Sequence, residues 1–269
     1  MTDKVGILFS ENEPYDTYLS RLRHSVRRRR LACQMICLER LAVGPRTARV
    51  CDILVPCTNH PQTASVVSVI ESQGIQVLNR GVRAAALNRV TINTSLHSAG
   101  ISTPQFWISP RLSQLLRQIP ESAYPIVVKS PSVPKAQINV LRDSEEFRHH
   151  ILRIGTAAGL DGSLFYAEQL LHTDDTFIKV YICGSDIACY RKFSDFLRKP
   201  ETVATTKVFR KLALQSRKAL DLDFLSLDAV SYEGAFAIVD VNVFPIFKYH
   251  TDAYDWLANA IYKLTKSSR

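Results

Sequence analysis

The sequence predicts a mixed α/β protein with a parallel sheet near its N-terminus and antiparallel hairpins near its C-terminus. Short apolar strands alternate with helices over the first 80 residues, which is typical of a parallel sheet with crossover helices. After residue 175, two pairs of apolar strands flank tight turns, which is typical of hairpins. The composition, 46% hydrophobic and 22% charged over 269 residues, is that of a globular chain, and the length suggests two domains.

The N-terminal strands are expected at residues 4–10, 34–38, 52–56 and 75–78, with helices at 15–30 and 63–73. Each strand is a short apolar run bounded by polar or turn residues. This order is typical of a Rossmann-like unit. The loop after the first strand, residues 9–14, has the sequence Phe-Ser-Glu-Asn-Glu-Pro and lacks Gly-x-Gly-x-x-Gly, so a dinucleotide site is excluded there.

The next helix, over 81–100, is expected to end at Gly100, because glycine stops a helix and the following Pro104 prevents its return. Strands are then expected at 124–129 and 163–168, around a helix at 144–155. One hairpin pairs 176–183 with 187–192 about a Gly-Ser-Asp turn, and a second pairs 224–230 with 235–241. Helices at 208–220 and 253–264 complete the predicted elements.

The charge of the chain is positive and concentrated in one segment. Lys and Arg number 34 against 25 Asp and Glu, a net charge of +9, and the cations gather in residues 21–30. No aromatic residues interleave with this run, as a single-strand nucleic-acid platform requires. Nucleic acid is therefore not expected as a partner, and Arg27–Arg30 is expected to be a solvated helix end whose cations complement the helix dipole.

The cysteines and the hydropathy pattern indicate a cellular setting. The six cysteines lack the close paired spacing of a zinc site and are expected to be buried structural thiols. No apolar run approaches the roughly 18–20 residues of a membrane span, and the N-terminus lacks the features of a signal peptide. The protein is expected to be soluble and cytoplasmic, with no membrane partner.

A candidate metal site lies in the second C-terminal hairpin. Asp228 is followed twelve residues later by Asp240, and Asn242 lies two residues further along the same strand. Residues two apart on a strand share a face, and Asp228 on the partner strand can face the same point. Two carboxylates and an amide oxygen suit a hard divalent ion, so the hairpin predicts a Mg²⁺ site.

Each of two further stretches is either an ordinary polar segment of the fold or part of a ligand-binding site. Lys129 ends an apolar strand, and it either extends to solvent at the sheet end or contacts an anion such as a nucleotide phosphate. Glu168 opens the segment Glu-Gln-Leu-Leu, and Asp175 follows seven residues later. This segment is either a polar linker or a strand that holds an adenine edge through backbone groups and a ribose through a carboxylate.

Together these stretches resemble the ATP-grasp superfamily, in particular its RimK-like carboxylate–amine ligases and its inositol polyphosphate kinases. The most specific matches are 177–184 (Phe-Ile-Lys-Val-Tyr-Ile-Cys-Gly), Asp228 and 240–245 (Asp-Val-Asn-Val-Phe-Pro). Segments 77–79 and 96–104 resemble the passage into the central domain. The resemblance implies an ATP-grasp fold with a Rossmann-like pre-ATP-grasp domain over 1–95, a small α+β central lid over 96–170, and a C-terminal α+β subdomain with the metal site over 171–269.

The resemblance also implies roles for individual residues. Mg²⁺, or Mn²⁺ in its place, would be held at the ATP phosphates by Asp228, Asp240 and Asn242. ATP would be contacted by the cofactor-binding residues Arg89, Lys129, Lys135, Glu168, Gln169, Leu170, Leu171 and Asp175, with the Leu170–Leu171 backbone at adenine and Asp175 at the ribose. Lys179 and Arg191 would be catalytic cations, and Lys192 and Lys248 would face an anionic substrate.

The activity implied first is an ATP- and Mg²⁺-dependent ligase that joins a small-molecule or peptide carboxylate to an amine through an acyl phosphate. An inositol or polyol phosphate kinase is the alternative, and a catalytically degenerate binding partner is the second. The second alternative follows from the loop 130–139, which has no glycine where the family usually has a glycine-rich loop. The chain also has Ile246, Arg89 and Asn88 where the family usually has Gly, Lys and Asp. Specificity is expected in loops 194–207 and 247–252, and a homo-oligomer is left open.

Overall fold

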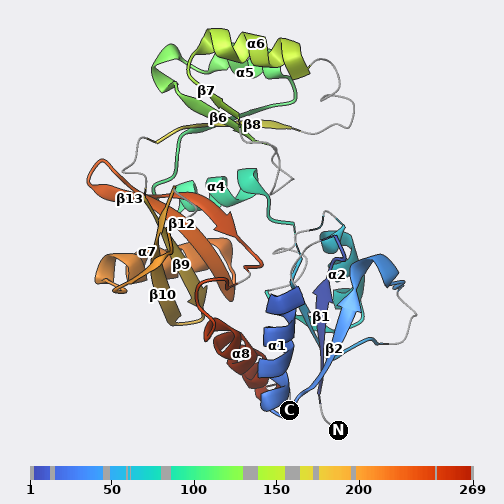
Figure 1. The fold of residues 1–269 in the computed structure, drawn as a ribbon. Helices are drawn as coiled ribbons and strands as arrows, with labels where there is room; N and C mark the ends of the chain where they lie inside the picture. Colours follow the sequence, from blue (N-terminus) through green and yellow to red (C-terminus); the bar gives the residue numbers. More distant parts are fainter. Residues whose placement is uncertain are drawn as a thin grey trace. The chain divides into compact units, whose positions relative to one another are not determined.

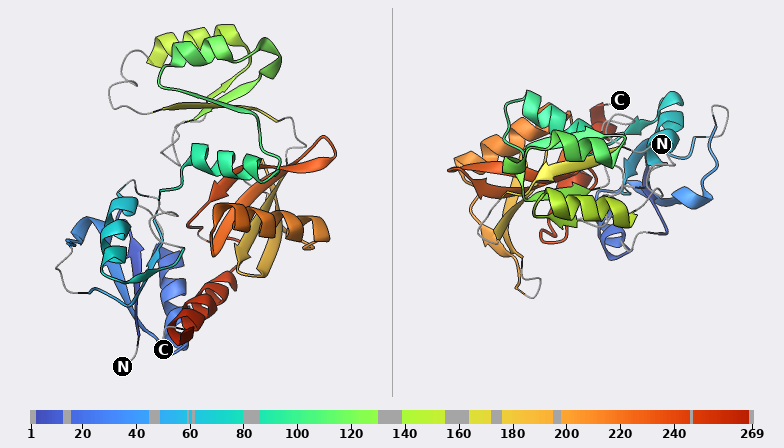
Figure 2. Two further views of the ribbon diagram at one scale, coloured as in Figure 1. Left: turned by 180° about the vertical axis from the view of Figure 1, so that it is seen from behind. Right: turned by 90° about the horizontal axis from the view of Figure 1, so that it is seen from above.

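The computed structural model describes residues 3–12, 16–44, 49–58, 60, 62–79, 86–129, 139–154, 164–171, 176–194, 198–245 and 247–267. The chain forms two compact units. Unit 1 contains residues 1–87, 175–229 and 240–269, and unit 2 contains residues 88–174 and 230–239. Figure 1 shows the elements of both units, and Figure 2 shows them from two further directions.

The N-terminal part of unit 1 is the parallel sheet that the sequence predicts. Its strands lie in the order β2-β1-β3-β4. They are β1 (Lys4–Phe9), β2 (Ala32–Cys37), β3 (Ile53–Pro56) and β4 (Gln76–Val77), and the helices are α1 (Asp16–Arg28) and α2 (Thr63–Ser72), with a short 3-10 turn at Leu38–Arg40. Apolar residues of α2 pack on one face of this sheet, where Val67 and Ile70 contact Leu8 and Leu54.

The C-terminal part of unit 1 is a five-stranded antiparallel sheet in the order β11-β10-β9-β12-β13, apart from the hairpin tip at residues 230–239, which belongs to unit 2. Its strands are β9 (Thr176–Cys183), β10 (Asp186–Phe193), β11 (Glu201–Val203), β12 (Phe224–Tyr232) and β13 (Ala235–Asn242). Helix α7 (Lys207–Leu220) connects β11 to β12, and helix α8 (Ala253–Ser267) follows β13. The predicted hairpin of β9 and β10 is confirmed, with Asp186 opposite Cys183 across the turn. Helix α8 packs beside α1, so both parts of unit 1 share one body.

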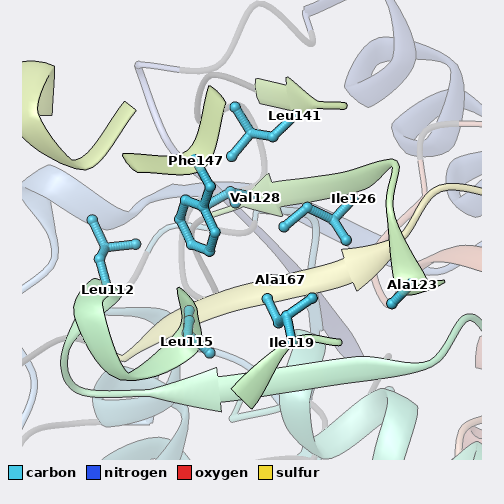
Figure 3. Packing of buried hydrophobic residues seen from close by; sticks show 9 residues of the cluster. All are labelled: Leu112, Leu115, Ile119, Ala123, Ile126, Val128, Leu141, Phe147 and Ala167. Atoms are coloured by element: carbon cyan, nitrogen blue, oxygen red, sulfur yellow. The ribbon is translucent and has the colours of Figure 1, made fainter. Parts of the chain in front are cut away.

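Unit 2 is a second antiparallel sheet in the order β5-β8-β6-β7. Its elements are α4 (Arg89–Ser98), β5 (Phe106–Ser109), α5 (Leu112–Gln118), a 3-10 turn at Glu121–Ala123, β6 (Ile126–Lys129), β7 (Asn139–Leu141), α6 (Ser144–Ile154) and β8 (Phe165–Gln169). Helices α5 and α6 cover one face of the sheet (Figures 1 and 2). Figure 3 shows the core of this layer, where Phe147 of α6 and Leu115 of α5 point onto Val128 and Ala167.

Several sequence predictions need correction at the level of elements. The strands β5, β7 and β11 and the helix α5 were not expected, because each has three to seven residues and too short a periodic pattern. Helix α4 begins at Arg89, and residues 81–85 of the predicted helix lie outside the described residues. The start is fixed by Asn88, whose side-chain oxygen accepts from the amides of Val90 and Thr91 at 3.0 and 3.1 Å in a capping box.

The Arg27–Arg30 run is only partly the solvated helix end that was expected. Arg28 is well exposed, but the Arg29 side chain is 18% exposed and is bound to α8. Its guanidinium donates to Asp255 Oδ1 at 2.9 Å and to Asn259 Oδ1 at 2.6 Å. One cation of the run is therefore a structural link between the first and last helices.

All six cysteines lie within the described residues and none forms a disulfide. Cys51, Cys183 and Cys189 are buried, and burial raises the pKa of each of these thiols, that of Cys51 to about 11. Across the described stretches of chain, no helix combines the length and the apolar character that crossing a bilayer requires.

Candidate functional site

Unit 2 holds a polar cluster on the sheet face opposite to the α5–α6 core. Lys129 at the end of β6 lies directly opposite Tyr166 of β8, and Glu168 lies two residues further along β8. Because alternate residues of a strand share a face, all three side chains emerge on the same side. The apolar core uses the intervening residues, Val128 and Ala167, on the other side.

The charges of this cluster are buried and paired. Glu168 is 4% exposed, and its Oε1 forms an ion pair with the ammonium of Lys129, whose side chain is 12% exposed. The Tyr166 hydroxyl donates to Glu168 Oε2 at 2.7 Å, and the Asn93 amide of α4 donates to the Tyr166 oxygen. Burial, and after it the neighbouring Glu168 charge, raises the pKa of Tyr166, so its hydroxyl stays protonated as a donor.

The rest of this face is apolar and partly open. The Phe106 ring stacks on Tyr166 with centroids 5.5 Å apart and an interplanar angle of 20°. Ile108, opposite Tyr166, is 39% exposed, and Val140, opposite Val127, is 48% exposed. An apolar surface beside one buried, hydrogen-bonded ion pair can accept a flat ring and present an ammonium to an anion.

The strand end that was expected to bind adenine uses some of its backbone amides for hydrogen bonds within unit 2. The Gln169 amide donates to the Gln105 carbonyl at 2.9 Å, and the Leu170 amide donates to the Pro125 carbonyl at 2.8 Å. Among the described residues, the Leu171 amide has no such partner, and Leu171 itself is buried. The amide of Leu171 is thus not committed to another described backbone group. Lys135 and Asp175 lie outside the described residues.

A second cluster lies on the five-stranded sheet of unit 1. Asp228 of β12 is directly opposite Lys179 of β9, with 3.2 Å between Nζ and Oδ2. The ammonium of Lys192 on β10 lies 3.4 Å from the other carboxylate oxygen. The side chains of Asp228 and Lys179 are 14% and 13% exposed. The structure therefore brings together three residues that the sequence predicted separately.

Asp240 and Asn242 lie on β13, which is hydrogen-bonded to the strand of Asp228. Both are partly buried, and the Asn242 Oδ1 accepts from the Phe244 amide at 3.0 Å, which fixes the orientation of the side chain. Within the described part of the chain, no three His, Cys, Asp or Glu residues form a metal-binding group. The set predicted from the sequence would be two carboxylates and one amide oxygen, which suits Mg²⁺ completed by phosphate and water oxygens and is too small for a closed all-protein cage.

Two predicted cations lie apart from this cluster. Arg191 precedes Lys192 on β10 and therefore points to the other face of the sheet, where its guanidinium lies 3.6 Å from Glu201 of β11. Lys248 is exposed, with its ammonium 5.5 Å from the Tyr249 ring centroid. The structure does not bring either residue to Asp228, so their predicted roles gain no support from this placement.

The predicted specificity segment 247–252 is held on the sheet by aromatic rings. Phe247 packs on Tyr181 with centroids 5.5 Å apart, and the Tyr190 hydroxyl lies 2.7 Å from Nδ1 of His250. Burial lowers the pKa of His250, against the smaller opposing effect of Asp252. Tyr181 and Tyr190 share a sheet face with Lys179 and Lys192, so this aromatic wall adjoins the charged cluster.

Sequence reasoning missed Tyr166 and Asn93. Tyr166 carried a usable signal, since it lies two residues before Glu168 on a predicted strand and must share its face. Asn93 carried none, because its contact with Tyr166 joins residues 73 positions apart.

Comparisons with known proteins identify the fold. The sequence matches no protein-family model and no curated protein. Among solved structures, a RimK-domain ATP-grasp protein from Sphaerobacter thermophilus has a TM-score of 0.76 at 16% identity over 95% of this chain and 98% of that one. A D-alanine–D-alanine ligase from Bacillus anthracis, complexed with ATP, has a TM-score of 0.72 at 15% identity over 97% of both chains. A D-cycloserine synthetase has a TM-score of 0.75 at 13% identity over 96% and 98%.

The chain therefore has the ATP-grasp fold, and the fold class implied by the sequence resemblance is confirmed. At these identities the likeness concerns the fold. What the protein does is argued from its own residues.

Proposed function

We propose that this protein is an ATP- and Mg²⁺-dependent ligase that joins a carboxylate to an amine through an acyl phosphate. The observation that carries the proposal is the cluster of Asp228 with Lys179 and Lys192, beside the Asp240 and Asn242 of β13. This cluster combines oxygen ligands for a divalent ion with cations for phosphate, on a fold shared with ATP-grasp ligases.

The nucleotide contacts are proposed on unit 2. The adenine ring is assigned to the apolar face beside Phe106, with the Leu171 amide as a hydrogen-bond donor. Lys129 is assigned to the phosphates, because an ammonium has three donors and, among the described residues, one is seen on Glu168. Arg89 at the first position of α4 would add a second cation. The roles of Lys135, Gln169 and Asp175 remain predictions.

The metal ligands are proposed on unit 1. Asp228, Asp240 and Asn242 would hold Mg²⁺, whose bound charge would offset that of the ATP phosphates, and we expect Mn²⁺ to substitute. Within the described part of the chain, Lys179 and Lys192 each give one donor to Asp228, and an ammonium has two further donors that phosphate oxygens could accept. They would neutralise charge on the transferring phosphoryl group.

The proposed reaction has two steps. A carboxylate oxygen of the substrate attacks the γ-phosphorus, and the bond from that phosphorus to the β–γ bridging oxygen breaks, which releases ADP. An amine nitrogen then attacks the acyl carbon, phosphate leaves with the electrons of the carbon–oxygen bond, and the nitrogen loses a proton to solvent. Both steps need positioning and charge neutralisation rather than a nucleophilic side chain, in agreement with the residues present.

A second candidate function is a nucleotide-binding protein without catalysis. The observation that favours it is the same ion-pair cluster, since Lys179 and Lys192 contact both carboxylate oxygens of Asp228. Under this alternative the protein would bind ATP but release no ADP with any pair of substrates.

The test is ADP release from ATP and Mg²⁺ with panels of carboxylates and amines. A ligase requires both a carboxylate and an amine, whereas a kinase would need a polyol phosphate alone. Asp240→Asn is expected to lower turnover by at least about 100-fold, since even residues that only support metal ligands are worth 10–100-fold. Asp186→Asn, at the exposed β9–β10 turn, is the matched control and should turn over normally. Equal turnover by wild type and Asp240→Asn would overturn the metal assignment.

The cellular setting and assembly belong to the same proposal. The absence of disulfides among the six cysteines supports a reducing compartment such as the cytoplasm. Sedimentation analysis would determine whether the protein forms a homo-oligomer.

A further inference from the structure

We propose that Tyr166 is a positioning residue whose hydroxyl holds the phosphate-binding cation Lys129 in place, and that Asn93 of α4 acts through it. The inference rests on the proposed function, because it concerns how ATP phosphates are gripped. It changes the role of Glu168, which becomes the acceptor that orients Lys129 rather than a group that reads adenine.

The first step is that both carboxylate oxygens of Glu168 already have a hydrogen-bond partner. Its Oε1 is paired with Lys129, and its Oε2 accepts from the Tyr166 hydroxyl at 2.7 Å. The residue is 4% exposed, so an additional partner would have to enter a site that is already filled. Because Glu168 is buried, its carboxylate is better suited to orienting Lys129 than to contacting a base.

The second step is that the Tyr166 hydroxyl is used as both donor and acceptor. It donates to Glu168 and accepts from the Asn93 amide, while its ring is fully buried and stacked on Phe106. The ring therefore cannot swing away, and the hydroxyl position is fixed by packing. A carboxylate held at one oxygen by such a donor presents its other oxygen, and with it the Lys129 ammonium, in one orientation.

The third step connects two cations. Asn93 and Arg89 are four residues apart on α4 and therefore lie on one face of the helix. The Arg89 charge also lowers the pKa of Tyr166, against the larger effect of burial. The hydrogen bonds from Asn93 through Tyr166 and Glu168 thus tie the helix that carries Arg89 to the strand that carries Lys129.

The consequence is a separation of phosphate binding from base binding. Loss of the Tyr166 hydroxyl should loosen Lys129 but leave the apolar face intact, since phenylalanine keeps the ring and its stacking on Phe106. Affinity for ATP and ADP should fall, and affinity for adenosine, which has no phosphate, should not.

The experiment measures the dissociation constants of adenosine, ADP and Mg²⁺–ATP for the full chain by isothermal titration. For Tyr166→Phe we expect roughly tenfold weaker binding of ADP and ATP, the size of one hydrogen bond to a charged group, and a change of less than about twofold for adenosine. Asn93→Ala, at the other end of the chain of hydrogen bonds, should also weaken the binding of ADP and ATP but not that of adenosine, by a smaller factor than Tyr166→Phe.

The matched control is Tyr124→Phe, because the Tyr124 hydroxyl is also buried in unit 2 yet has no hydrogen-bond partner among the described residues. It should leave all three constants unchanged. Equal loss of adenosine and ATP binding in Tyr166→Phe, or no loss at all, would overturn the positioning role, and if Tyr166→Phe fails to fold, Asn93→Ala decides by the same criteria. Failure of the wild type to bind ATP would instead reject the proposed function, and this inference with it.

Discussion

Asn79 is completely buried and uses every hydrogen-bonding position of its side chain. Its Nδ2 donates to the carbonyls of Phe224 at 2.5 Å and Val243 at 2.9 Å. Its Oδ1 accepts from the amides of Asp223 at 2.5 Å and Phe224 at 3.0 Å. A single residue after β4 thereby joins the parallel sheet of unit 1 to the strands that carry Asp228 and Asn242.

Asn79→Ala should lower the free energy of unfolding by about 3 kcal/mol or more, because buried backbone groups that lose their partners cost about 1–3 kcal/mol each. Urea denaturation measures this change. Asn259→Ala is the control, since Asn259 makes one exposed contact with Arg29 and should cost no more than about 1 kcal/mol. Equal midpoints for the two variants would contradict the role assigned to Asn79.

At the scale of elements, the long periodic segments could be predicted, whereas several of the short ones, β5, β7, β11 and α5, could not. Helix α1 and strand β9 were expected within one or two residues of their observed bounds, because their apolar pattern extends over several turns or pleats. Strand β7 has three residues and exists because it pairs with β6. Local sequence contains no such information, since the stability of a short strand comes from its neighbour.

The contact between α1 and α8 gives the prediction at this scale. Arg29 donates to Asp255 Oδ1 at 2.9 Å and to the Asp255 carbonyl at 2.9 Å, whereas the exposed Arg28 approaches the same carboxylate only to 3.9 Å. Arg29→Ala should lower the free energy of unfolding at pH 7 by about 2 kcal/mol, the size of hydrogen bonds to charged groups. Arg28→Ala should change it by less than about 0.5 kcal/mol, as for exposed ion pairs.

The pH dependence of the Arg29→Ala effect follows from Asp255. Burial alone would raise the pKa of Asp255, but hydrogen bonds from Arg29 and Ser25 and the charges of both arginines hold it below its usual value. A carboxyl group with a lowered folded-state pKa contributes stability above its unfolded pKa of about 3.9, and this contribution is lost as pH falls further. The difference in the free energy of unfolding between wild type and Arg29→Ala should therefore become smaller below about pH 4. Urea midpoints between pH 3 and 7 measure it, and a constant difference would exclude the charge contribution.

At the scale of the whole molecule, residue types and order, together with the family resemblance, were sufficient to predict the fold, whereas the functional roles of Lys129, Glu168, Lys179, Lys192 and Asp228 stay predictions. Their partners could not be predicted, because each contact joins strands distant in sequence. Lys179 and Asp228 are 49 residues apart, and Lys129 and Glu168 are 39 apart. Arg191 illustrates the same limit. Strand alternation predicts that Arg191 and Lys192 point to opposite faces of the sheet, but only the register of β10 with β9 determines that Lys192 shares the face of Lys179.

The prediction for the whole protein is that ATP stabilises it in a Mg²⁺-dependent manner. A ligand that binds only the folded state at 100 times its dissociation constant adds about 2.7 kcal/mol, so ATP with Mg²⁺ should raise the melting temperature by several degrees in a thermal unfolding experiment. A chelator should remove most of this shift, because the proposed ligands Asp228, Asp240 and Asn242 need the ion to bind the phosphates. Lys129 and the apolar face should retain a smaller, metal-independent part of the shift.

The variant Asp240→Asn tests the same site. With Mg²⁺ present, ATP should shift its melting temperature only as much as it shifts that of the wild type without Mg²⁺. A shift that is identical with and without Mg²⁺ would reject the metal site and favour the non-catalytic alternative, because the lysines paired with Asp228 would then be its permanent partners.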